Sequence, residues 1–248
     1  SSTALTYHYD QDILDGVQEF GREVGLGNED NTKTVWRAGP YPLLRLPTDT
    51  GSSLYFFGDG WVHVGTAVGF LLTGYWGEFT RPWNTGLQLF HGMFVSTLFS
   101  QAIKRATGRE SPTEQTTDRG AWRPFPSINA YNKHTARYDA YPSGHIMTAT
   151  LTFTMLAENY PEHSYWIFPL EVTWLTLLGL QMINNGVHWA SDYPLGIAMG
   201  YQIGKISSRM GKTKGNEKRG ETQSLFKNSF FYTGLVDNTP TFNVFISY

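Results

Sequence analysis

The feature that most constrains the fold is a series of five apolar segments of helical length within the 248-residue chain. They occupy residues 61–76, 85–105, 143–160, 165–185 and 194–209. The first two are interrupted by polar residues, namely His63, His91, Ser96, Ser100 and Gln101. Because a membrane-spanning helix needs about 20 mostly apolar residues, we interpret these first two segments as buried helices of a bundle, with contact to lipid as the alternative. The predicted fold class is all-α.

The composition argues against several classes of protein and of catalytic site. Charged residues make up 16% of the chain, below the roughly 25% of ordinary soluble proteins, yet the mean hydropathy of −0.32 argues against a polytopic membrane protein. The net charge of −2 gives no indication of nucleic-acid binding. The absence of Cys excludes disulfides, thiolate metal sites and a Cys nucleophile. The chain begins with Ser1 rather than Met, which favours an exported protein, in the bacterial periplasm or cell envelope.

Three regions are predicted along the chain. Residues 1–60 form an amphipathic helix at 10–24 and irregular loops, with little regular structure over 41–60, packed on the bundle. Residues 61–209 form the main helical domain, and residues 210–248 form a charged linker and a tail. Apolar and polar residues alternate in places over 241–248, which predicts a short C-terminal strand.

One candidate site lies where a loop ends and an apolar helix begins, at Tyr141-Pro-Ser-Gly-His145. Ser143 and Gly144 would lie at the helix N-terminus, where free N–H groups and the helix dipole favour an anion. His145 would lie in the first turn, able to give a proton to a leaving group. The structural alternative is an N-cap serine beside an incidental histidine.

Two further positions carry candidate chemistry. His188 and Asp192 are four residues apart, which places both on one face of a helix. A carboxylate bonded to one imidazole nitrogen fixes the tautomer and raises the basicity of the other. Lys104 closes an apolar segment just before a long polar connection, 108–141, which is rich in Arg. Taken alone, these residues also fit a structural His–Asp hydrogen bond and an ordinary helix C-cap.

Together the three segments resemble the signature of the type 2 phosphatidic acid phosphatase superfamily, which includes bacterial acid phosphatases and vanadium haloperoxidases. The family pattern runs Lys-x6-Arg-Pro, then Pro-Ser-Gly-His, then Ser-Arg-x5-His-x3-Asp. Lys104 and Pro112 match the first block, residues 142–145 match the second completely, and His188 and Asp192 match the third. Order and spacing agree over residues 104–192.

The resemblance implies a phosphatase built on a helical bundle. His188 would attack phosphorus and form a phosphohistidine, Asp192 would orient His188, and His145 would protonate the leaving alkoxide. Lys104, Ser143 and the Gly144 N–H would hold the phosphate oxygens. No metal ion or other cofactor is implied, because fixed cations and N–H groups neutralise the transition state. The expected substrate is a phosphate or diphosphate ester of a small molecule or lipid, including isoprenyl lipids, with peripheral membrane contact and no nucleic acid.

Both family arginines are missing from their places. Ser111 and Met182 occupy these positions, and Gln181 replaces the family serine. Because one charge-assisted hydrogen bond contributes about 1.5–3 kcal/mol, we predict that Arg109 and Arg123 from the long connection substitute as substrate-binding groups. Two alternatives stay open: a vanadate-dependent haloperoxidase, and a non-catalytic envelope protein with a degenerate phosphate pocket.

Overall fold

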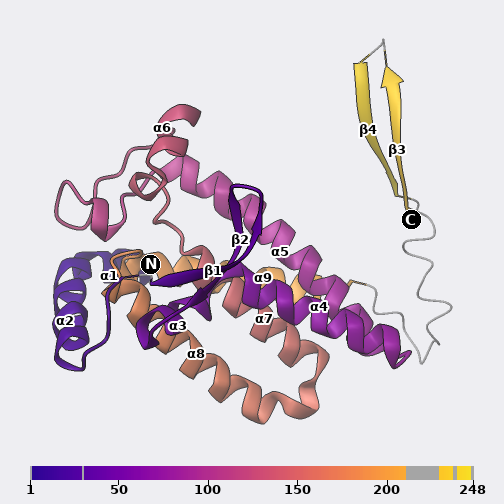
Figure 1. Cartoon of the computed structure of the whole chain (residues 1–248), viewed down its shortest axis with the longest axis horizontal. Coiled ribbons are helices and arrows are strands. Elements are labelled where there is room, and N and C mark those ends of the chain that lie inside the picture. Colours follow the sequence, from indigo (N-terminus) through magenta and orange to yellow (C-terminus); the bar gives the residue numbers. More distant parts are fainter. Residues whose placement is uncertain (1, 30, 211–228, 237–238, 247–248) are drawn as a thin grey trace.

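The computed structural model describes residues 2–29, 31–210, 229–236 and 239–246, and within them the chain is mostly helical (Figure 1). The helices are α1 Ser2–His8, α2 Asp10–Glu23, α3 Thr50–Phe56, α4 Gly60–Trp76, α5 Thr80–Thr107, α6 Ile128–Lys133, α7 Gly144–Asn159, α8 Ser164–Asn184 and α9 Tyr193–Ser207. The strands are β1 Thr32–Ala38, β2 Tyr41–Pro47, β3 Ser229–Val236 and β4 Thr239–Ile246. The five predicted apolar helices are thus confirmed as α4, α5, α7, α8 and α9.

Helix α7 is the centre of the bundle, since α4, α5, α8 and α9 all pack against it. One side of α7 meets the α4–α5 pair through Leu151 and Met155. Another side meets α8 through Ile146 and Ala149. Most of its residues are buried, which agrees with a sequence that has no Asp, Glu, Lys or Arg before Glu158.

Glycines on α9 allow that helix to lie directly against α7. Gly196, Gly200 and Gly204 recur every four residues and therefore share one face. A Cβ at Gly200 would lie 2.3 Å from the Met147 carbonyl oxygen, and one at Gly196 would lie 2.8 Å from that of Ser143. The close approach places the first turns of α7 and α9 side by side.

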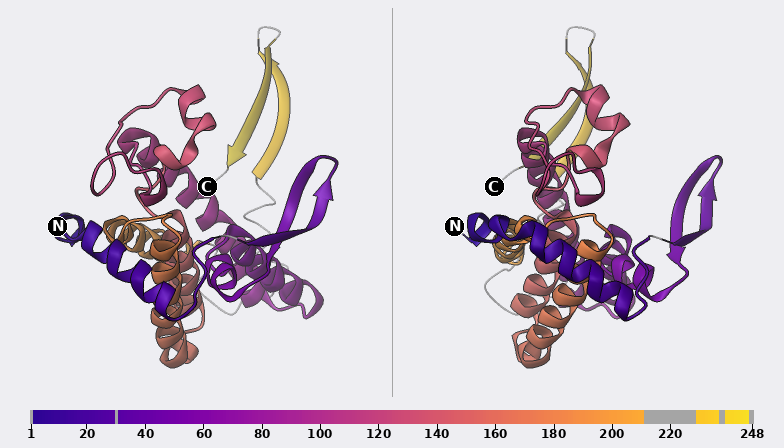
Figure 2. Two further views of the ribbon diagram at one scale, coloured as in Figure 1. Left: turned by 60° about the vertical axis from the view of Figure 1, so that its left-hand side comes forward. Right: turned by 90° about the vertical axis from the view of Figure 1, so that its left-hand side faces the viewer.

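The N-terminal region packs across one end of the bundle (Figure 2). Leu14 of α2 joins a buried cluster with Ile183 of α8 and with Trp189. The expectation of little regular structure over 41–60 was wrong: β1 and β2 form an antiparallel hairpin, and α3 follows it. The sequence did not predict these strands because apolar and polar residues do not alternate cleanly along them. Backbone pairing between β1 and β2 forms the hairpin.

The C-terminal tail forms a hairpin rather than a single strand. Strand β4 pairs antiparallel with β3 along its whole length, from Thr239 to Ile246. The partner strand β3 lies in the predicted linker and tail, for which the sequence predicted one short strand only. The rest of the predicted charged linker, 211–228, and Tyr248 lie outside the described residues.

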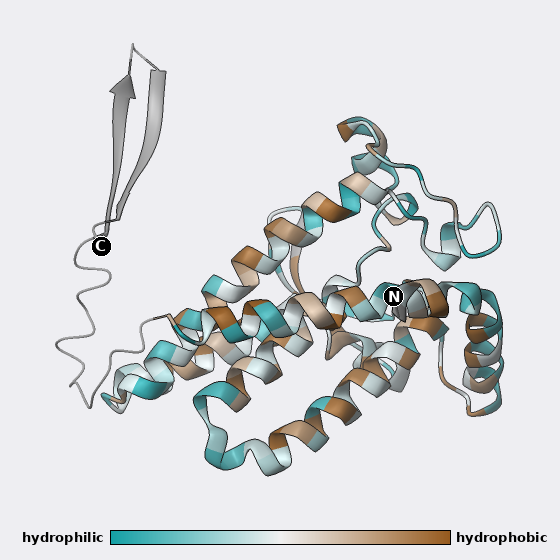
Figure 3. Cartoon of the chain, turned by 180° about the vertical axis from the view of Figure 1, so that it is seen from behind, coloured by the Kyte–Doolittle hydropathy of each residue, from teal (hydrophilic) through white to brown (hydrophobic). Residues whose placement is uncertain are grey.

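The outer faces of α4, α5 and α8 carry exposed apolar side chains, so α4 and α5, predicted as buried helices, are only partly buried. Figure 3 shows the apolar residues along the ribbons of these helices. The exposed side chains include Val68, Leu72, Tyr75 and Trp76 on α4, Phe90, Phe94, Leu98 and Phe99 on α5, and Tyr165, Trp166, Phe168, Leu170, Val172, Leu177 and Leu180 on α8. Among the described residues, one segment, Pro161–Asn184, is long and apolar enough to cross a membrane by length and composition.

The α7–α9 contact predicts a steep sensitivity to added volume. We expect Gly200→Ala to lower the free energy of unfolding by about 1–3 kcal/mol, because its new methyl group forces the two backbones apart. Gly69→Ala on α4 is the matched control, since a Cβ there has no neighbour within 4 Å. Urea denaturation of both variants measures the difference. Equal stabilities would contradict the close-packing interpretation.

A buried histidine between α4 and α7 predicts a pH-dependent stability. Burial lowers the pKa of His63 from 6.5 to about 4. The unfolded chain therefore takes up a proton near pH 6.5, whereas the folded chain does so only near pH 4, so stability is lost as the pH falls between these values. We expect His63→Leu to remove about 3 kcal/mol of that loss, measured by urea denaturation at pH 7 and pH 4. The exposed His134→Leu variant is the control, and an unaltered loss in His63→Leu would contradict the prediction.

Candidate active site

Three segments distant in sequence meet at the end of the bundle where α7 begins. Lys104 comes from the last turn of α5, residues 143–145 begin α7, and His188 lies in the loop between α8 and α9. The Ser143 N–H donates to the Asp192 carbonyl oxygen at 3.1 Å. The Thr107 hydroxyl donates to the Tyr141 carbonyl oxygen at 3.3 Å. These bonds hold the three segments together. The order and spacing of the family motifs along the sequence predicted that they would meet.

His188 is held in one tautomer by a backbone carbonyl. Its side chain is 3% exposed, and Nδ1 lies 2.7 Å from the Ala140 carbonyl oxygen. Because a carbonyl oxygen only accepts hydrogen bonds, Nδ1 must carry the proton. In the neutral form of this ring Nε2 keeps its lone pair, which is the requirement for a nucleophile.

Asp192 supports His188 differently from the way the sequence predicted. Its Oδ2 lies 3.6 Å from His188 Nδ1, beyond hydrogen-bond distance, while the Ala140 carbonyl oxygen takes the hydrogen bond. The two residues do not share a helix, because His188 precedes a 3₁₀ turn at Ala190–Asp192. Asp192 Oδ2 accepts the Trp189 N–H at 2.7 Å, which closes this turn.

Arg109 lies behind Asp192 and is completely buried. Its Nη1 donates to Asp192 Oδ1 at 2.5 Å, and its Nη2 donates to Asp10 Oδ2 at 2.6 Å. Ser191 Oγ and the Arg119 carbonyl oxygen accept its other hydrogen bonds. Both Nη atoms are thus occupied by the protein itself. The prediction that Arg109 grips the substrate phosphate finds no support in these contacts.

Arg123 and the two substituted family positions also have partners within the fold. Arg123 forms an ion pair with the buried Glu110 and donates to Thr116 Oγ1 at 2.9 Å. Ser111 Oγ lies 3.2 Å from Thr113 Oγ1, and Met182 is buried in the α7–α8 core. None of these contacts directs a guanidinium toward His188, so the predicted substitution by Arg123 is likewise unsupported by its contacts.

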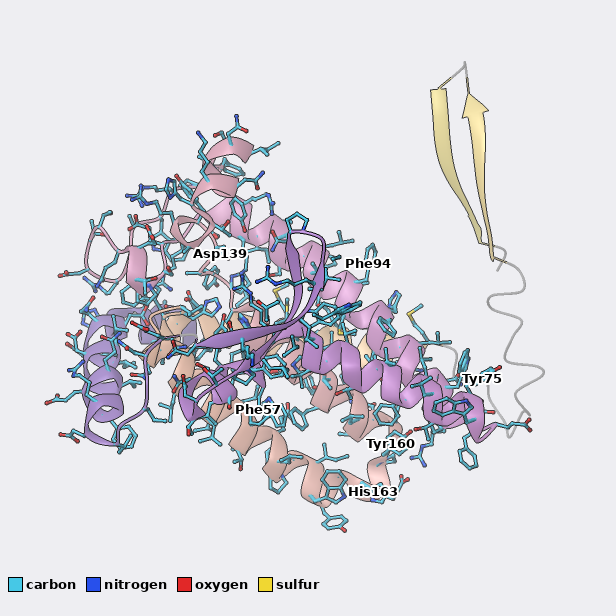
Figure 4. The ribbon with its side chains drawn as sticks, viewed as in Figure 1. Phe57, Tyr75, Phe94, Asp139, Tyr160 and His163 are labelled. Atoms are coloured by element: carbon cyan, nitrogen blue, oxygen red, sulfur yellow. The ribbon has the colours of Figure 1, made fainter. Side chains whose placement is uncertain are left out.

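The predicted anion-binding groups gather around the first residue of α7. Ser143 caps the helix, its Oγ accepting the Ile146 N–H at 3.4 Å. A Cβ placed on Gly144 would lie 3.9 Å from Ser100 Oγ and 4.0 Å from Lys104 Nζ. Lys104 is nearly buried and its Nζ lies 3.6 Å from Asp139 Oδ2, a residue labelled in Figure 4. One ammonium, one hydroxyl and a helix N-terminus therefore surround Gly144, a combination suited to a phosphate.

His145 stands between two other rings. Its imidazole lies 5.2 Å from the Tyr55 ring and 5.8 Å from that of His188, measured between centroids. Burial, followed by the charges of His188, Lys104 and His63, lowers the pKa of His145 to about 3. At neutral pH His145 is consequently a neutral imidazole, and a nearby anion favours its protonated form.

Several residues of this site escaped sequence reasoning. Asp10 reads as an ordinary acidic residue at the start of a helix, and Ser191 reads as a loop residue. Ser100 and Tyr55 gave no motif. Only the fold brings these residues to the site, so no local pattern could have revealed them. Within the described part of the chain, no group of three or more His, Asp or Glu residues is arranged to hold a metal ion.

Several known proteins are similar to this chain in sequence. The chain is 30% identical over 115 residues to a protein named lipid A 1-phosphatase from Rhizobium etli, covering 46% of this chain and 45% of that protein. It is 35% identical over 68 residues to a lipid A 1-phosphatase from Porphyromonas gingivalis, covering 27% of this chain and 15% of that protein. The chain spans less than half the length of these curated relatives, and no solved structure gives a significant match. Residues 85–216, more than half of the chain and including Lys104, His145, His188 and Asp192, match the model described as the PAP2 superfamily, and the chain belongs to that family.

Proposed function

We propose that this protein is a metal-independent phosphatase that hydrolyses phosphate or diphosphate esters of a lipid through a phosphohistidine at His188. The observation that carries the proposal is the hydrogen bond from His188 Nδ1 to the Ala140 carbonyl oxygen. It selects, for the neutral ring, the tautomer whose Nε2 carries the lone pair, and the ring lies edge-on to His145. Family membership supports the same class of reaction.

The proposed reaction has two displacements at phosphorus. Nε2 of His188 attacks phosphorus, the ester P–O bond breaks, and the leaving oxygen takes a proton from His145. Water then attacks the phosphorus of the phosphohistidine, the P–N bond breaks, and His145 takes a proton from that water. Lys104 and the N–H groups at the start of α7 stabilise the charge on the other phosphate oxygens. The negative Asp192 stabilises the positive ring that forms when His188 carries the phosphoryl group.

Two observations support a lipid as the substrate. The relatives described above are named for the removal of a phosphate from lipid A. The exposed apolar faces of α4, α5 and α8 supply a surface on which the protein could rest against a membrane; Phe94 and Tyr75, labelled in Figure 4, belong to them. An exported location stays a prediction of the sequence.

The identity of the nucleophile gives the first test of the function. We expect wild-type protein to release phosphate from phosphatidate, farnesyl diphosphate or a lipid A phosphate, and His188→Ala to lose at least about 10³-fold in kcat, because no other group takes the nucleophile's place. Acid-quenched incubation with a ³²P-labelled substrate should trap a phosphohistidine in the wild type alone.

Three outcomes would contradict this proposal. Phosphate release that survives His188→Ala would overturn the mechanism. Peroxide-dependent halide oxidation on addition of vanadate, without phosphate release, would favour a haloperoxidase. Binding of phosphate with no turnover of any of these substrates would favour a non-catalytic binding protein.

The low pKa of His145 gives a prediction for pH dependence. Between about pH 3 and pH 6 a free phosphate monoester carries one proton while His145 is neutral, so the substrate itself delivers the proton that His145 needs. We expect kcat/KM for p-nitrophenyl phosphate to be flat below about pH 6 and to fall about tenfold for each pH unit above it. His145→Gln should lower the plateau by about 10²–10⁴-fold. A kcat/KM that rises above pH 6 would contradict this role.

A further inference from the structure

A buried charge network joins the N-terminal helix to the loop that carries His188. Asp10 is the first residue of α2, and its side chain is completely buried. Its Oδ2 accepts Arg109 Nη2 at 2.6 Å and the Ser191 hydroxyl at 2.5 Å. Its Oδ1 accepts the Ser191 N–H at 2.9 Å. Both oxygens of the Asp10 carboxylate therefore accept hydrogen bonds, from Arg109 or from Ser191 in the 3₁₀ turn that contains Asp192.

The far side of the same network touches the proposed nucleophile. Arg109 Nη1 donates to Asp192 Oδ1 at 2.5 Å, and Asp192 Oδ2 lies 3.6 Å from Nδ1 of His188. The network thus runs from Asp10 through Arg109 and Asp192 to His188, although Asp10 lies 181 positions before Ser191. All of its charged side chains are inaccessible to solvent.

The balance of formal charge gives Asp10 a specific part. Two carboxylates face one guanidinium, so the network carries one negative charge in excess. Without Asp10, Arg109 and Asp192 would form a neutral pair, and Arg109 would cancel most of the field that Asp192 exerts on His188. With Asp10 present, the charge of Arg109 is shared between two carboxylates. Asp192 then keeps its negative potential toward a ring that becomes positive when it accepts a phosphoryl group.

Fold stability alone is a poor reason for such a network. Removing two carboxylates and a guanidinium from water costs several kcal/mol for each ion, and apolar residues of similar volume often stabilise a core equally well. The location of the network, directly behind His188, is what a positioning role requires.

We propose that Asp10 is a positioning residue of the phosphoryl-transfer site, which through Arg109 and Ser191 holds Asp192 and the His188 loop and preserves the negative charge beside the nucleophile. This inference rests on the proposed function. It assigns to the N-terminal helix, which lies before the region matched by the family model, a part in the reaction. Arg109 then acts within this chain as the link between that helix and Asp192.

The test compares two variants of the same helix. Asp10→Asn removes the buried charge while keeping the shape of the side chain. Asp12→Asn removes the same charge from the exposed side of the first turn and is the matched control. We expect Asp10→Asn to slow the formation of the phosphoenzyme, and hence kcat, by at least about tenfold, with KM within about twofold of the wild type. Asp12→Asn should retain the wild-type kcat and KM.

A second readout does not depend on activity. The Nδ1 proton of His188, buried and bonded to Ala140, should give a downfield resonance in ¹H–¹⁵N spectra that correlate the ring nitrogens. We expect this resonance to shift or broaden in Asp10→Asn and to be unchanged in Asp12→Asn. If the wild type releases no phosphate, the proposed function fails, and the spectra still decide whether Asp10 acts on His188.

The outcomes separate positioning from a merely structural role. An unchanged kcat and an unchanged His188 resonance in Asp10→Asn would overturn the proposal, and so would equal effects in both variants. If circular dichroism shows that Asp10→Asn does not fold, Ser191→Ala replaces it, because it removes one hydroxyl from the network and no charge. A kcat lowered about threefold or more with a shifted His188 resonance in Ser191→Ala would then support the proposal, and wild-type values would overturn it.

Discussion

The close contact of α9 with α7 is the constraint on which the rest of this structure depends. Glycines one turn apart let the α9 backbone lie against carbonyl oxygens of α7, beginning with that of Ser143. This contact aligns the N-termini of the two helices, and the hydrogen bond from Ser143 N–H to the Asp192 carbonyl oxygen completes the alignment. The candidate anion-binding residues at the N-terminus of α7 therefore lie close to the loop before α9 that carries His188. A side chain at Gly200 would separate the two halves of the site.

A backbone carbonyl and a buried network of charged side chains surround His188, the proposed nucleophile. The Ala140 carbonyl fixes the proton of His188 on Nδ1, and Asp192 contributes its charge at 3.6 Å. Arg109, which the sequence offered as a substrate ligand, binds two carboxylates behind the site. Positive charge on the substrate side then rests on Lys104 and on the start of α7. Lys104 occupies the place of the family lysine, whereas Ser111 and Met182 stand where the family has its two arginines.

Sequence reasoning succeeded where the signal was local. Apolar periodicity over 10–24 and over the five bundle segments predicted α2, α4, α5, α7, α8 and α9 within a few residues at most boundaries. The motif at 142–145 predicted a helix N-terminus, which Ser143 and Gly144 form. It failed where pairing partners are remote. Strands β1 and β2 lack a clean alternation, the partner of β4 went unassigned, and the four-residue spacing of His188 and Asp192 suggested a helix where the chain makes a 3₁₀ turn.

The sequence by itself determined the family and the helical class and predicted the candidate site residues, because these depend on residue type and on spacing along the chain. Only the tertiary structure decided what each reactive residue touches. The partners of His188, Arg109 and Asp10 lie 48, 83 and 181 positions away along the chain. Contacts of that separation are set by how helices pack, and a buried Arg and an exposed Arg look alike in sequence. The difference between a ligand for phosphate and a support for the nucleophile is therefore a property of the fold.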